Sequence, residues 1–524
     1  MLHDDRKTLY SIPFCSSLKN QGIARKNHVA IIDGQSGESI TYGELYHRVP
    51  RMATWLSTHG IGFGDHVACL SLNSKAYIEF LCALAWIGAV AVPLNIRLNP
   101  KELNYIVRDS GAKAIFSCAF FVGIADQVIQ DIPSIALKIL AAEPQDGWSS
   151  FSALIDEGND GAVISEKVSG ESLFMLLYTS GTTGKPKGCM IPQRVWTGYA
   201  MHMAACFQMG PQDVYLGFLP YFHVAGFGTA IAQLILGGTL VTIAMPDPSA
   251  MYRLIEKHRV TFMFLVPGIS VPFLYHEARE ERDVSSLKVL IGGAGGEKLE
   301  FVNDVETLLG TRYYGIYGQT ESGGKVTWAD ADMIRENPLT YGHVMPFFDY
   351  RIVDEQDNDV EQGDVGELCL RGIPVMLGYW NLPDASAETL RNGWHHTGDL
   401  FMCMENGQVR MVDRNKYLIK TGGENVYPQE VEMALLSHSE IADVAVIGVR
   451  NDEWGEAVKA FIVLKEGSQL SRTDIAAWVK QSIAGYKAPR FIDFVDALPR
   501  NASGKLLKGE LGERTTTSDQ RVKY

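Results

Sequence analysis

Short apolar runs alternate with helical patterns from residue 28 to residue 165. Three runs have the length of buried strands: Val29–Ile32, Val67–Leu72 and Lys113–Phe116. Between the first two, apolar residues recur at helical spacing at Leu45, Val49 and Met52. Residues 213 to 310 continue in the same style. Strands that alternate with helices predict an α/β architecture, with mostly parallel sheets flanked by helices.

The longest uncharged apolar run extends from Phe80 to Leu94 and contains Pro93. A helix needs about 20 apolar residues to cross a bilayer, and this run is shorter. We therefore expect a buried helix that continues into a strand, and no transmembrane segment.

The last hundred or so residues show a different pattern. Pro428 is well placed as the first residue of a helix that runs to Leu436, and Ala442–Val449 is strand-like. A second helix is expected to open at Ser471, because Asp474 completes a variant of the capping box. This mixture predicts a small α+β domain.

The length and composition of the chain make several classes of function improbable. At 524 residues the chain is too long for one ordinary domain. Its formal net charge of -14 disfavours a nucleic-acid partner, because phosphate binding relies on stripes of lysine and arginine. The 8 cysteines include no CxxC pair, so neither a zinc site nor a disulfide framework is indicated. Reduced thiols and the lack of an apolar signal core favour a cytoplasmic enzyme.

A loop rich in glycine, threonine and lysine lies between two strand-like segments, Leu173–Leu177 and Cys189–Ile191. Its glycines let backbone N–H groups approach an anion closely, its hydroxyls add donors, and its lysines add positive charge. The spacing is not that of a Walker A loop, and Pro186 stands where that motif needs serine or threonine. The chemistry indicates a site for a polyphosphate.

This stretch closely resembles the phosphate-loop signature of the acyl-adenylate-forming enzymes. That family includes acyl-CoA synthetases, adenylation domains of nonribosomal peptide synthetases and firefly luciferase. The resemblance implies that the loop holds the phosphates of ATP. The residues that it assigns to this role are Thr179, Ser180, Gly181, Thr182, Thr183, Gly184, Lys185 and Lys187.

The stretch Tyr313–Glu321 matches the family's Tyr-Gly-x-Thr-Glu motif. The resemblance implies that Glu321 is a catalytic residue that holds Mg²⁺ together with Thr179. A carboxylate suits this hard cation, which prefers one or two carboxylates plus substrate phosphates. The resemblance also assigns Tyr317, Gly318 and Thr320 of this motif to the nucleotide. Of these, Tyr317 would stack on the adenine ring.

A glycine-rich loop follows the strand-like run Val289–Ile291. Ligands of α/β sheets gather at the carboxyl ends of such strands. The loop resembles the family's adenine-facing loop, which assigns Gly293, Ala294 and Gly295 to the nucleotide. Relatives usually have proline where this chain has Gly295, so a looser loop is expected.

Two adjacent histidines, His395 and His396, precede Asp399. Neighbours on a strand point to opposite faces, which disfavours a metal pair. The resemblance implies instead that Asp399 accepts hydrogen bonds from the ribose hydroxyls, a role that suits an acceptor-only carboxylate. Arg414 is expected to join it at the ribose or phosphate.

The resemblance also implies a mobile second domain that presents a different face in each of two reaction steps. The boundary is expected at a hinge, Lys416. It separates an N-terminal ATP- and acyl-binding domain, residues 1–415, from residues 416–524, with a disordered tail from about 515. Lys505 ends a Pro-Arg-Asn-x-x-Gly-Lys match and should bridge the substrate carboxylate and the α-phosphate. The other face is assigned to coenzyme A through Lys420, Gly422, Gly423 and Glu424.

The implied activity is that of an AMP-forming acyl-CoA ligase, an acid–thiol ligase that uses ATP, Mg²⁺ and coenzyme A. His223, in a motif that resembles Leu-Pro-x-Phe-His, is expected as a catalytic residue beside the acyl pocket. Lys325 is expected to face solvent, the alternative being a pairing with a second polar group on the substrate. The implied pocket walls are apolar or small, and comprise Tyr221–Thr229, Val266–Ile269, Gly292–Gly296 and Gly323–Thr327.

These walls suit a fatty, aryl or terpenoid-like acid. Two alternatives stay open, namely an acyl-AMP ligase that loads a carrier protein and a carnitine-type ligase for a small polar acid. A non-catalytic nucleotide-binding protein is disfavoured, because Glu321, Asp399 and Lys505 are all present. Whether the chain forms a homodimer also stays open.

Overall fold

The computed structural model describes residues 11–161, 164–179, 186–266, 268–293, 299–414, 417, 419–421, 424–451, 455–483, 485–500 and 506–513. The chain divides into two compact units. The first comprises residues 1–350 and 370–396, and the second comprises residues 351–369 and 397–524. The boundary passes within three strands, which are β17 (Phe348–Val353), β18 (Val365–Gly372) and β19 (His395–Cys403).

A seven-stranded sheet organises the N-terminal part of the first unit, in the order β7-β6-β5-β3-β4-β8-β9. Its neighbours are parallel except for β8 and β9, which form an antiparallel hairpin. The strands are β3 (His66–Leu70), β4 (Val90–Pro93), β5 (Ala114–Cys118), β6 (Leu137–Ala141), β7 (Ser149–Ser150), β8 (Leu173–Thr179) and β9 (Lys187–Pro192).

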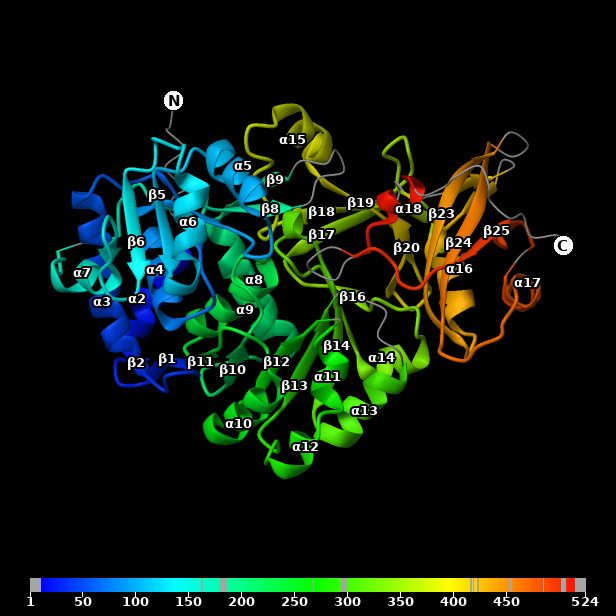
Figure 1. Ribbon diagram of the computed structural model, residues 1–524, viewed down its shortest axis with the longest axis horizontal. Helices are drawn as coiled ribbons and strands as arrows, with labels where there is room; N and C mark the ends of the chain where they lie inside the picture. The colour runs from blue at the N-terminus through cyan, green and yellow to red at the C-terminus, as the bar shows by residue number, and fades with distance from the viewer. Residues whose placement is uncertain are drawn as a thin grey trace. The chain divides into compact units, whose positions relative to one another are not determined.

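Side chains along this sheet alternate between two hydrophobic cores. In β3, Val67 and Cys69 belong to one core, whereas Ala68 and Leu70 belong to the other. Burial on both faces explains why these strands are continuous apolar runs. The covering helices are α3 (Tyr42–Thr58) and α4 (Lys75–Ile87) on the first face, and α5 (Pro100–Ser110) and α6 (Val122–Ile129) on the second (Figure 1).

A nine-stranded sheet follows, in the order β16-β15-β14-β13-β12-β10-β11-β1-β2. Its six inner strands, from β14 to β1, are parallel, and the strands at its two edges are antiparallel. The strands are β1 (Val29–Asp33), β2 (Ser39–Thr41), β10 (Val214–Gly217), β11 (Thr239–Thr242), β12 (Phe262–Leu265), β13 (Val289–Gly293), β14 (Arg312–Tyr317), β15 (Thr327–Asp330) and β16 (His343–Val344).

Helices α8 and α9 pack against each other and share one core with strands of both sheets. Trp196 of α8 meets Phe227 of α9 edge to face, with 4.7 Å between ring centroids. Phe174 of β8 packs on the same Phe227 ring at 5.8 Å. The remaining helices of this unit are α2 (Phe14–Ala24), α7 (Phe151–Asp156), α8 (Gln193–Phe207), α9 (Val224–Ile235), α10 (Pro248–His258), α11 (Ser270–Leu274), α12 (Ala278–Glu281), α13 (Leu299–Leu309), α14 (Ala331–Glu336) and α15 (Pro383–Thr389), with short 3₁₀ turns η1 (Ala119–Phe121), η2 (Thr320–Ser322) and η3 (Arg391–Gly393).

The second unit has its own core beneath a sheet in the order β22-β21-β24-β23, with β25 paired to β24. A second, four-stranded sheet runs β17-β18-β19-β20. The further elements are β20 (Val409–Arg414), β21 (Ile419–Thr421), β22 (Glu424–Val426), β23 (Ile441–Asn451), β24 (Gly455–Leu464), β25 (Phe491–Phe494), α16 (Pro428–Leu436), α17 (Arg472–Ser482), η5 (Gly485–Lys487) and α18 (Lys508–Glu513).

The predicted fold class is confirmed. The run from Phe80 to Leu94 is α4 followed by β4, joined at Gly88, whose φ of 75° ends the helix in a left-handed cap. Pro428 is the first residue of α16, and Ser471 caps α17 in a capping box with Asp474. Within the described ranges, no helix is both long and apolar enough to cross a membrane.

Candidate functional site

The β8–β9 hairpin carries the first candidate residues. Thr179 ends β8 and lies opposite Lys187, the first residue of β9. Both therefore border the glycine-rich loop on neighbouring strands, as the sequence predicts. The Lys187 ammonium lies over the ring of Tyr379, 5.2 Å from its centroid. The other loop residues assigned to phosphates lie outside the described residues: Ser180, Gly181, Thr182, Thr183, Gly184 and Lys185.

Glu321 lies in η2, directly beyond the carboxyl end of β14. Its Oε1 accepts a 2.9 Å hydrogen bond from the Tyr379 hydroxyl. Its carbonyl oxygen accepts a 2.9 Å bond from the Met376 N–H. The carboxylate is therefore positioned by both its backbone and its side chain, through one segment, residues 376–380.

The segment 376–380 also pairs with β9. Met190 N–H donates to Gly378 O at 2.8 Å, Leu377 N–H donates to Met190 O at 2.9 Å, and Trp380 N–H donates to Gly188 O at 2.8 Å. These bonds connect the end of β14 to the hairpin that borders the loop. Residues from three distant parts of the sequence thus meet at one edge of the unit.

Cys189 connects Thr179 to Glu321. Its Sγ lies 3.9 Å from the Thr179 hydroxyl, and its backbone forms a bridge with Tyr379. Burial raises the pKa of the Cys189 thiol well above its usual value, and the nearby Glu321 carboxylate raises it further. The thiol is therefore protonated at neutral pH. The Thr179 hydroxyl and the Glu321 carboxylate, and not the thiol, are the groups here that suit a hard cation or a phosphate.

The residues assigned to the nucleotide from the sequence lie at or just beyond the ends of β13 and β14. Tyr317 is buried, and its ring meets that of Tyr341 edge to face at 6.1 Å. Thr320 opens η2. A Cβ placed on Gly318 would come 2.2 Å from Gly324 O, so the backbone approach there requires glycine. Gly293 ends β13, whereas Ala294 and Gly295 lie outside the described residues.

His223 is the N-cap residue of α9. Its ring lies 4.5 Å from that of Phe222, and burial lowers the pKa of His223 to about 4, with a smaller effect from Arg97. The imidazole is therefore neutral at physiological pH. The next residue, Val224, touches the turn that follows Glu321, because a Cβ on Gly324 would meet its methyl groups at 3.0 Å.

Lys325 does not face solvent, so that prediction is wrong. The residue is 1% exposed, and its ammonium lies 3.4 Å from the centroid of the Tyr199 ring. The left-handed conformations of Gly323 and Gly324, with φ of 72° and 93°, turn the chain inward immediately before it. From the sequence alone, a single lysine in a polar stretch is expected to face solvent. The turn at Gly323 and Gly324 instead directs the chain into the interior.

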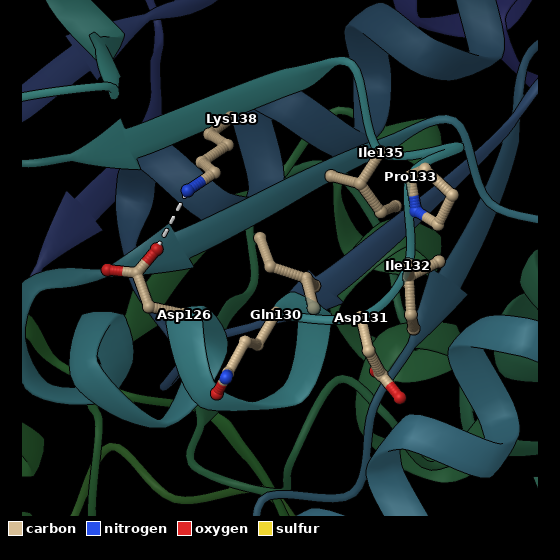
Figure 2. Close-up of a pocket in the computed structure, with 8 residues that line it drawn as sticks. Asp126, Gln130, Asp131, Ile132, Pro133, Ile135 and Lys138 are labelled. Carbon is tan, nitrogen blue, oxygen red and sulfur yellow. Dashed lines mark hydrogen bonds and ion pairs between the residues drawn. The ribbon is translucent and has the colours of Figure 1, made fainter.

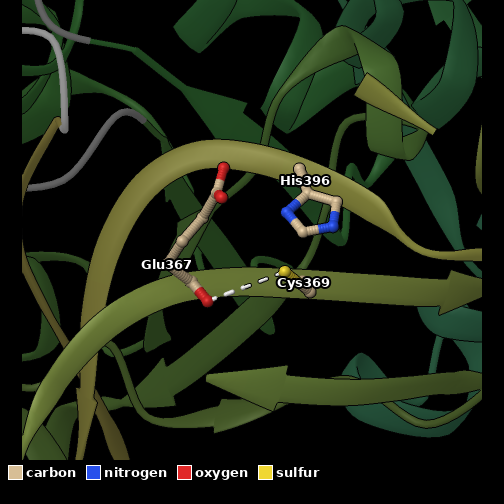
Figure 3. A group of neighbouring side chains, drawn as sticks. All are labelled: Glu367, Cys369 and His396. Atoms are coloured by element: carbon tan, nitrogen blue, oxygen red, sulfur yellow. Dashed lines mark hydrogen bonds between the residues drawn. The ribbon is translucent and has the colours of Figure 1, made fainter. Parts of the chain in front are cut away.

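The second unit carries the predicted ribose residues. The register of β19 and β20 places Asp399 directly opposite Arg414. Thr397 and Gly398 hold this strand to β18, through a 2.7 Å bond from the Thr397 hydroxyl to Leu368 O and a 2.8 Å bond from Gly398 N–H to Glu367 Oε1. Figure 3 shows Glu367 on β18 beside Cys369, whose thiol donates to the Glu367 carbonyl.

The predicted coenzyme A residues border the hairpin of β21 and β22, where Lys420 pairs with Asn425 and Thr421 with Glu424. Gly422 and Gly423 lie outside the described residues, as do the hinge Lys416, the tail from 515 and Lys505. The residues on either side of 501–505, Arg500 and Leu506, belong to the described part of the chain. They form a backbone bridge with each other, and the Arg500 side chain pairs with Asp443 at 2.7 Å.

A surface hollow of about 370 Å³ lies elsewhere on the first unit (Figure 2). It is lined by α6, the connection after it and β6, and includes an ion pair between Asp126 and Lys138 at 2.9 Å. None of the predicted site residues lines it. The hollow is therefore separate from the candidate site.

Sequence reasoning missed Tyr379 and Tyr199. Tyr379 contacts Glu321 across 58 residues of sequence, and Tyr199 contacts Lys325 from a helix that reads as ordinary core. The adjacent Gly378-Tyr379-Trp380 pattern, a glycine followed by two aromatic residues, is a weak signal for the first. No local spacing signals the second.

Comparison with known proteins shows the family of this chain. Residues 18–380 match the model of the AMP-binding enzyme family, and residues 430–505 match that of the AMP-binding enzyme C-terminal domain. A feruloyl-CoA synthase of Amycolatopsis is 34% identical over 95% of this chain and 100% of its own length. An indoleacetate–CoA ligase of Aromatoleum aromaticum is 32% identical over 90% of this chain and 92% of its own.

Among solved structures, the o-succinylbenzoate CoA synthetase of Bacillus subtilis in complex with its acyl-adenylate intermediate is similar, with a TM-score of 0.82. It is 27% identical, and the match covers 97% of this chain and 99% of that one. With the family models spanning most of both units, the chain belongs to the AMP-binding enzymes, the acyl-adenylate-forming superfamily.

Proposed function

We propose that this chain is an ATP-dependent acyl-CoA ligase. A carboxylate oxygen of the acid attacks the α-phosphate of ATP, which forms acyl-AMP and releases pyrophosphate. The thiol of coenzyme A then attacks the acyl carbon, loses its proton and displaces AMP. The observation that carries the proposal is the position of Glu321, fixed beside the hairpin that borders the phosphate loop.

Both nucleophiles come from the substrates, so the side chains need only bind, orient and neutralise charge. Thr179 and Lys187 face the phosphates from the two strands of the hairpin. Asp399, opposite Arg414, accepts hydrogen bonds from the ribose hydroxyls. Tyr317 stacks against the adenine ring.

The donor set fits Mg²⁺. Glu321 offers a carboxylate that is partly exposed, and Thr179 offers a hydroxyl, which are the hard oxygen ligands that this cation prefers. When bound, Mg²⁺ would neutralise charge on the phosphates. Tyr379 holds the carboxylate in one orientation.

Residues 416–524 would present a different face in each step, rotating about a hinge at Lys416. One face presents Lys505 for adenylation. The other presents the hairpin of β21 and β22 for coenzyme A, with Gly422 and Gly423 leaving room for the pantetheine arm. In this proposal, rotation about the boundary between residues 415 and 416 exchanges the two faces between the two reaction steps.

The acid is proposed to be aryl or otherwise largely apolar. Relatives of this chain include ligases named for ferulate, indoleacetate and 2-succinylbenzoate. Tyr199, Phe264 and Val224 supply aromatic and apolar surface near the turn after Glu321. One relative, the ligase ScoC of Streptomyces coeruleorubidus, is named for transfer of a fatty acid to an acyl carrier protein. Transfer to a carrier protein is accordingly the second candidate.

A panel of carboxylic acids tests the proposal. Purified enzyme is given ATP, Mg²⁺ and each acid, with and without coenzyme A, and AMP and pyrophosphate are measured. We expect pyrophosphate release that depends on the acid, and thioester formation only when coenzyme A is present. If no acid consumes ATP, the ligase function is wrong. If acyl-AMP forms but coenzyme A is never used, the carrier-protein alternative replaces it.

Tyr379→Phe is expected to lower the rate of acyl-AMP formation about tenfold and to raise the Mg²⁺ concentration that gives half the maximal rate. The change removes a hydrogen bond to a charged group but keeps the ring, and such bonds are worth about 1.5–3 kcal/mol. Pyrophosphate release measured over a Mg²⁺ series checks it. Tyr275→Phe is the matched control, because that hydroxyl donates to Asp304 on α13, away from the site. A slower variant with wild-type Mg²⁺ dependence would show that Tyr379 is only structural.

A further inference from the structure

Lys325 is a buried lysine, 1% exposed, that has no carboxylate partner among the described residues. Among the described residues it donates one hydrogen bond, to the Thr229 hydroxyl at 3.4 Å, which is long for such a bond. No aspartate or glutamate of the described residues lies within ion-pair distance of it. An ammonium has three donors, so most of the hydrogen-bonding capacity of Lys325 is not used by the residues that the structure describes.

Aromatic rings surround the ammonium. It lies over the Tyr199 ring at 3.4 Å and 5.1 Å from the centroid of the Phe264 ring. The Tyr199 hydroxyl is itself committed to Thr229 at 2.7 Å. Rings attract the cation but do not replace its lost hydration, so a buried ammonium in this setting stays energetically costly.

Tyr215 adds a second polar group in the same layer. Its hydroxyl is buried and has no hydrogen-bond partner in the part of the chain that the structure describes. Burial raises the pKa of Tyr215 well above its usual value, the nearby Tyr199 raises it further, and the nearby Thr229 hydroxyl lowers it. The Lys325 ammonium, which has one long hydrogen bond, and the Tyr215 hydroxyl, which has none among the described residues, thus both lie near Thr229. Unsatisfied buried donors are rare in folded proteins and need a reason.

The location of Lys325 supplies a reason. Phe264, one of its two ring partners, lies near the carboxyl end of β12, on the side of a parallel sheet where α/β proteins bind ligands. Lys325 follows Glu321 by four positions, and two left-handed glycines separate them. Glu321 contacts Tyr379, whereas Lys325 contacts Tyr199 and Thr229.

We propose that Lys325 binds the end of the substrate acid that is remote from the reacting carboxylate, and that the preferred acids carry a hydrogen-bond-accepting oxygen there. This inference rests on the proposed ligase function. The aromatic walls suit the apolar body of such an acid. Its terminal oxygen would replace the long contact to Thr229 and use the remaining donors of the ammonium.

The test compares matched acids in the wild type and in Lys325→Met, which keeps the length and removes the charge. The acids are hexanoate with hexanedioate, and phenylpropanoate with its para-hydroxy and para-carboxy derivatives. The readout is kcat/KM for pyrophosphate release, expressed as the ratio of each oxygen-bearing acid to its unsubstituted parent. We expect the ratio to fall about tenfold or more in Lys325→Met, because a charge-assisted hydrogen bond is lost.

Two further measurements separate specificity from folding. The Tm of Lys325→Met should stay level or rise, because an uncompensated buried charge is removed. Lys325→Gln, which keeps a donor, should retain preference for the para-hydroxy acid and lose it for the para-carboxy acid. Lys257→Met, at an exposed position near the end of α10, is the control and should change no ratio.

A lower Tm together with unchanged ratios would overturn the proposal, since Lys325 would then be structural, while the ligase function would stand. Equal losses for substituted and unsubstituted acids would overturn it in the same way. Absence of pyrophosphate release with every acid would contradict the ligase function itself, and this inference with it.

Discussion

Glu321→Gln is expected to lower kcat/KM for acyl-AMP formation about a hundredfold and to raise the Mg²⁺ requirement. Glutamine keeps the size of the side chain and an oxygen acceptor for the Tyr379 hydroxyl, which donates at 2.9 Å. It removes the negative charge that favours a cation. Metal contacts stabilise transition-state charge by several kcal/mol, and about 1.4 kcal/mol corresponds to a factor of ten in rate.

Pyrophosphate release at increasing Mg²⁺ concentrations measures this effect. High Mg²⁺ should restore part of the lost rate, because the variant still offers oxygens to the cation. Glu336→Gln, exposed at the end of α14, removes one negative charge elsewhere and should behave as the wild type. If Glu321→Gln shows the wild-type Mg²⁺ dependence, the carboxylate does not hold the cation.

Much of this site could be predicted from the sequence, because its parts are local. The strand before Thr179 and the strand from Lys187 are each visible as apolar runs. Residues at the carboxyl ends of parallel strands meet on one side of a sheet, and Gly293 and Tyr317 end the neighbouring parallel strands β13 and β14. In the second unit, Asp399 and Arg414 are likewise brought into register by one antiparallel pair.

Contacts that cross between distant elements could not be predicted in this way. Tyr379 reaches Glu321 only because segment 376–380 pairs with β9, and nothing local in either stretch specifies that pairing. The burial of Lys325 depends on left-handed backbone at Gly323 and Gly324, together with its contacts to Tyr199 of α8 and Thr229 of α9. Sequence periodicity describes one element at a time, so it gives no signal for a charged side chain that is buried between elements.

Lys505→Ala is expected to lower the rate of acyl-AMP formation by about 10²–10³-fold, the usual cost of losing one preorganised charge contact. The stretch that ends in Lys505 is anchored on both sides, since Arg500 bridges Leu506 and pairs with Asp443 at 2.7 Å. Removing the ammonium should therefore change the chemistry and leave the fold intact. An unchanged Tm would support this.

The second half-reaction separates this role from a general binding role. In that step coenzyme A displaces AMP and no pyrophosphate leaves, so a lysine that stabilises charge on the phosphates during adenylation has little to stabilise. Supplied acyl-adenylate plus coenzyme A should accordingly react in Lys505→Ala within a few-fold of the wild-type rate, measured as thioester. Lys465→Ala, which removes an exposed lysine after β24, should affect neither step. Equal loss in both steps would contradict the assignment of the two reactions to different faces of the small domain, because one face would then serve both.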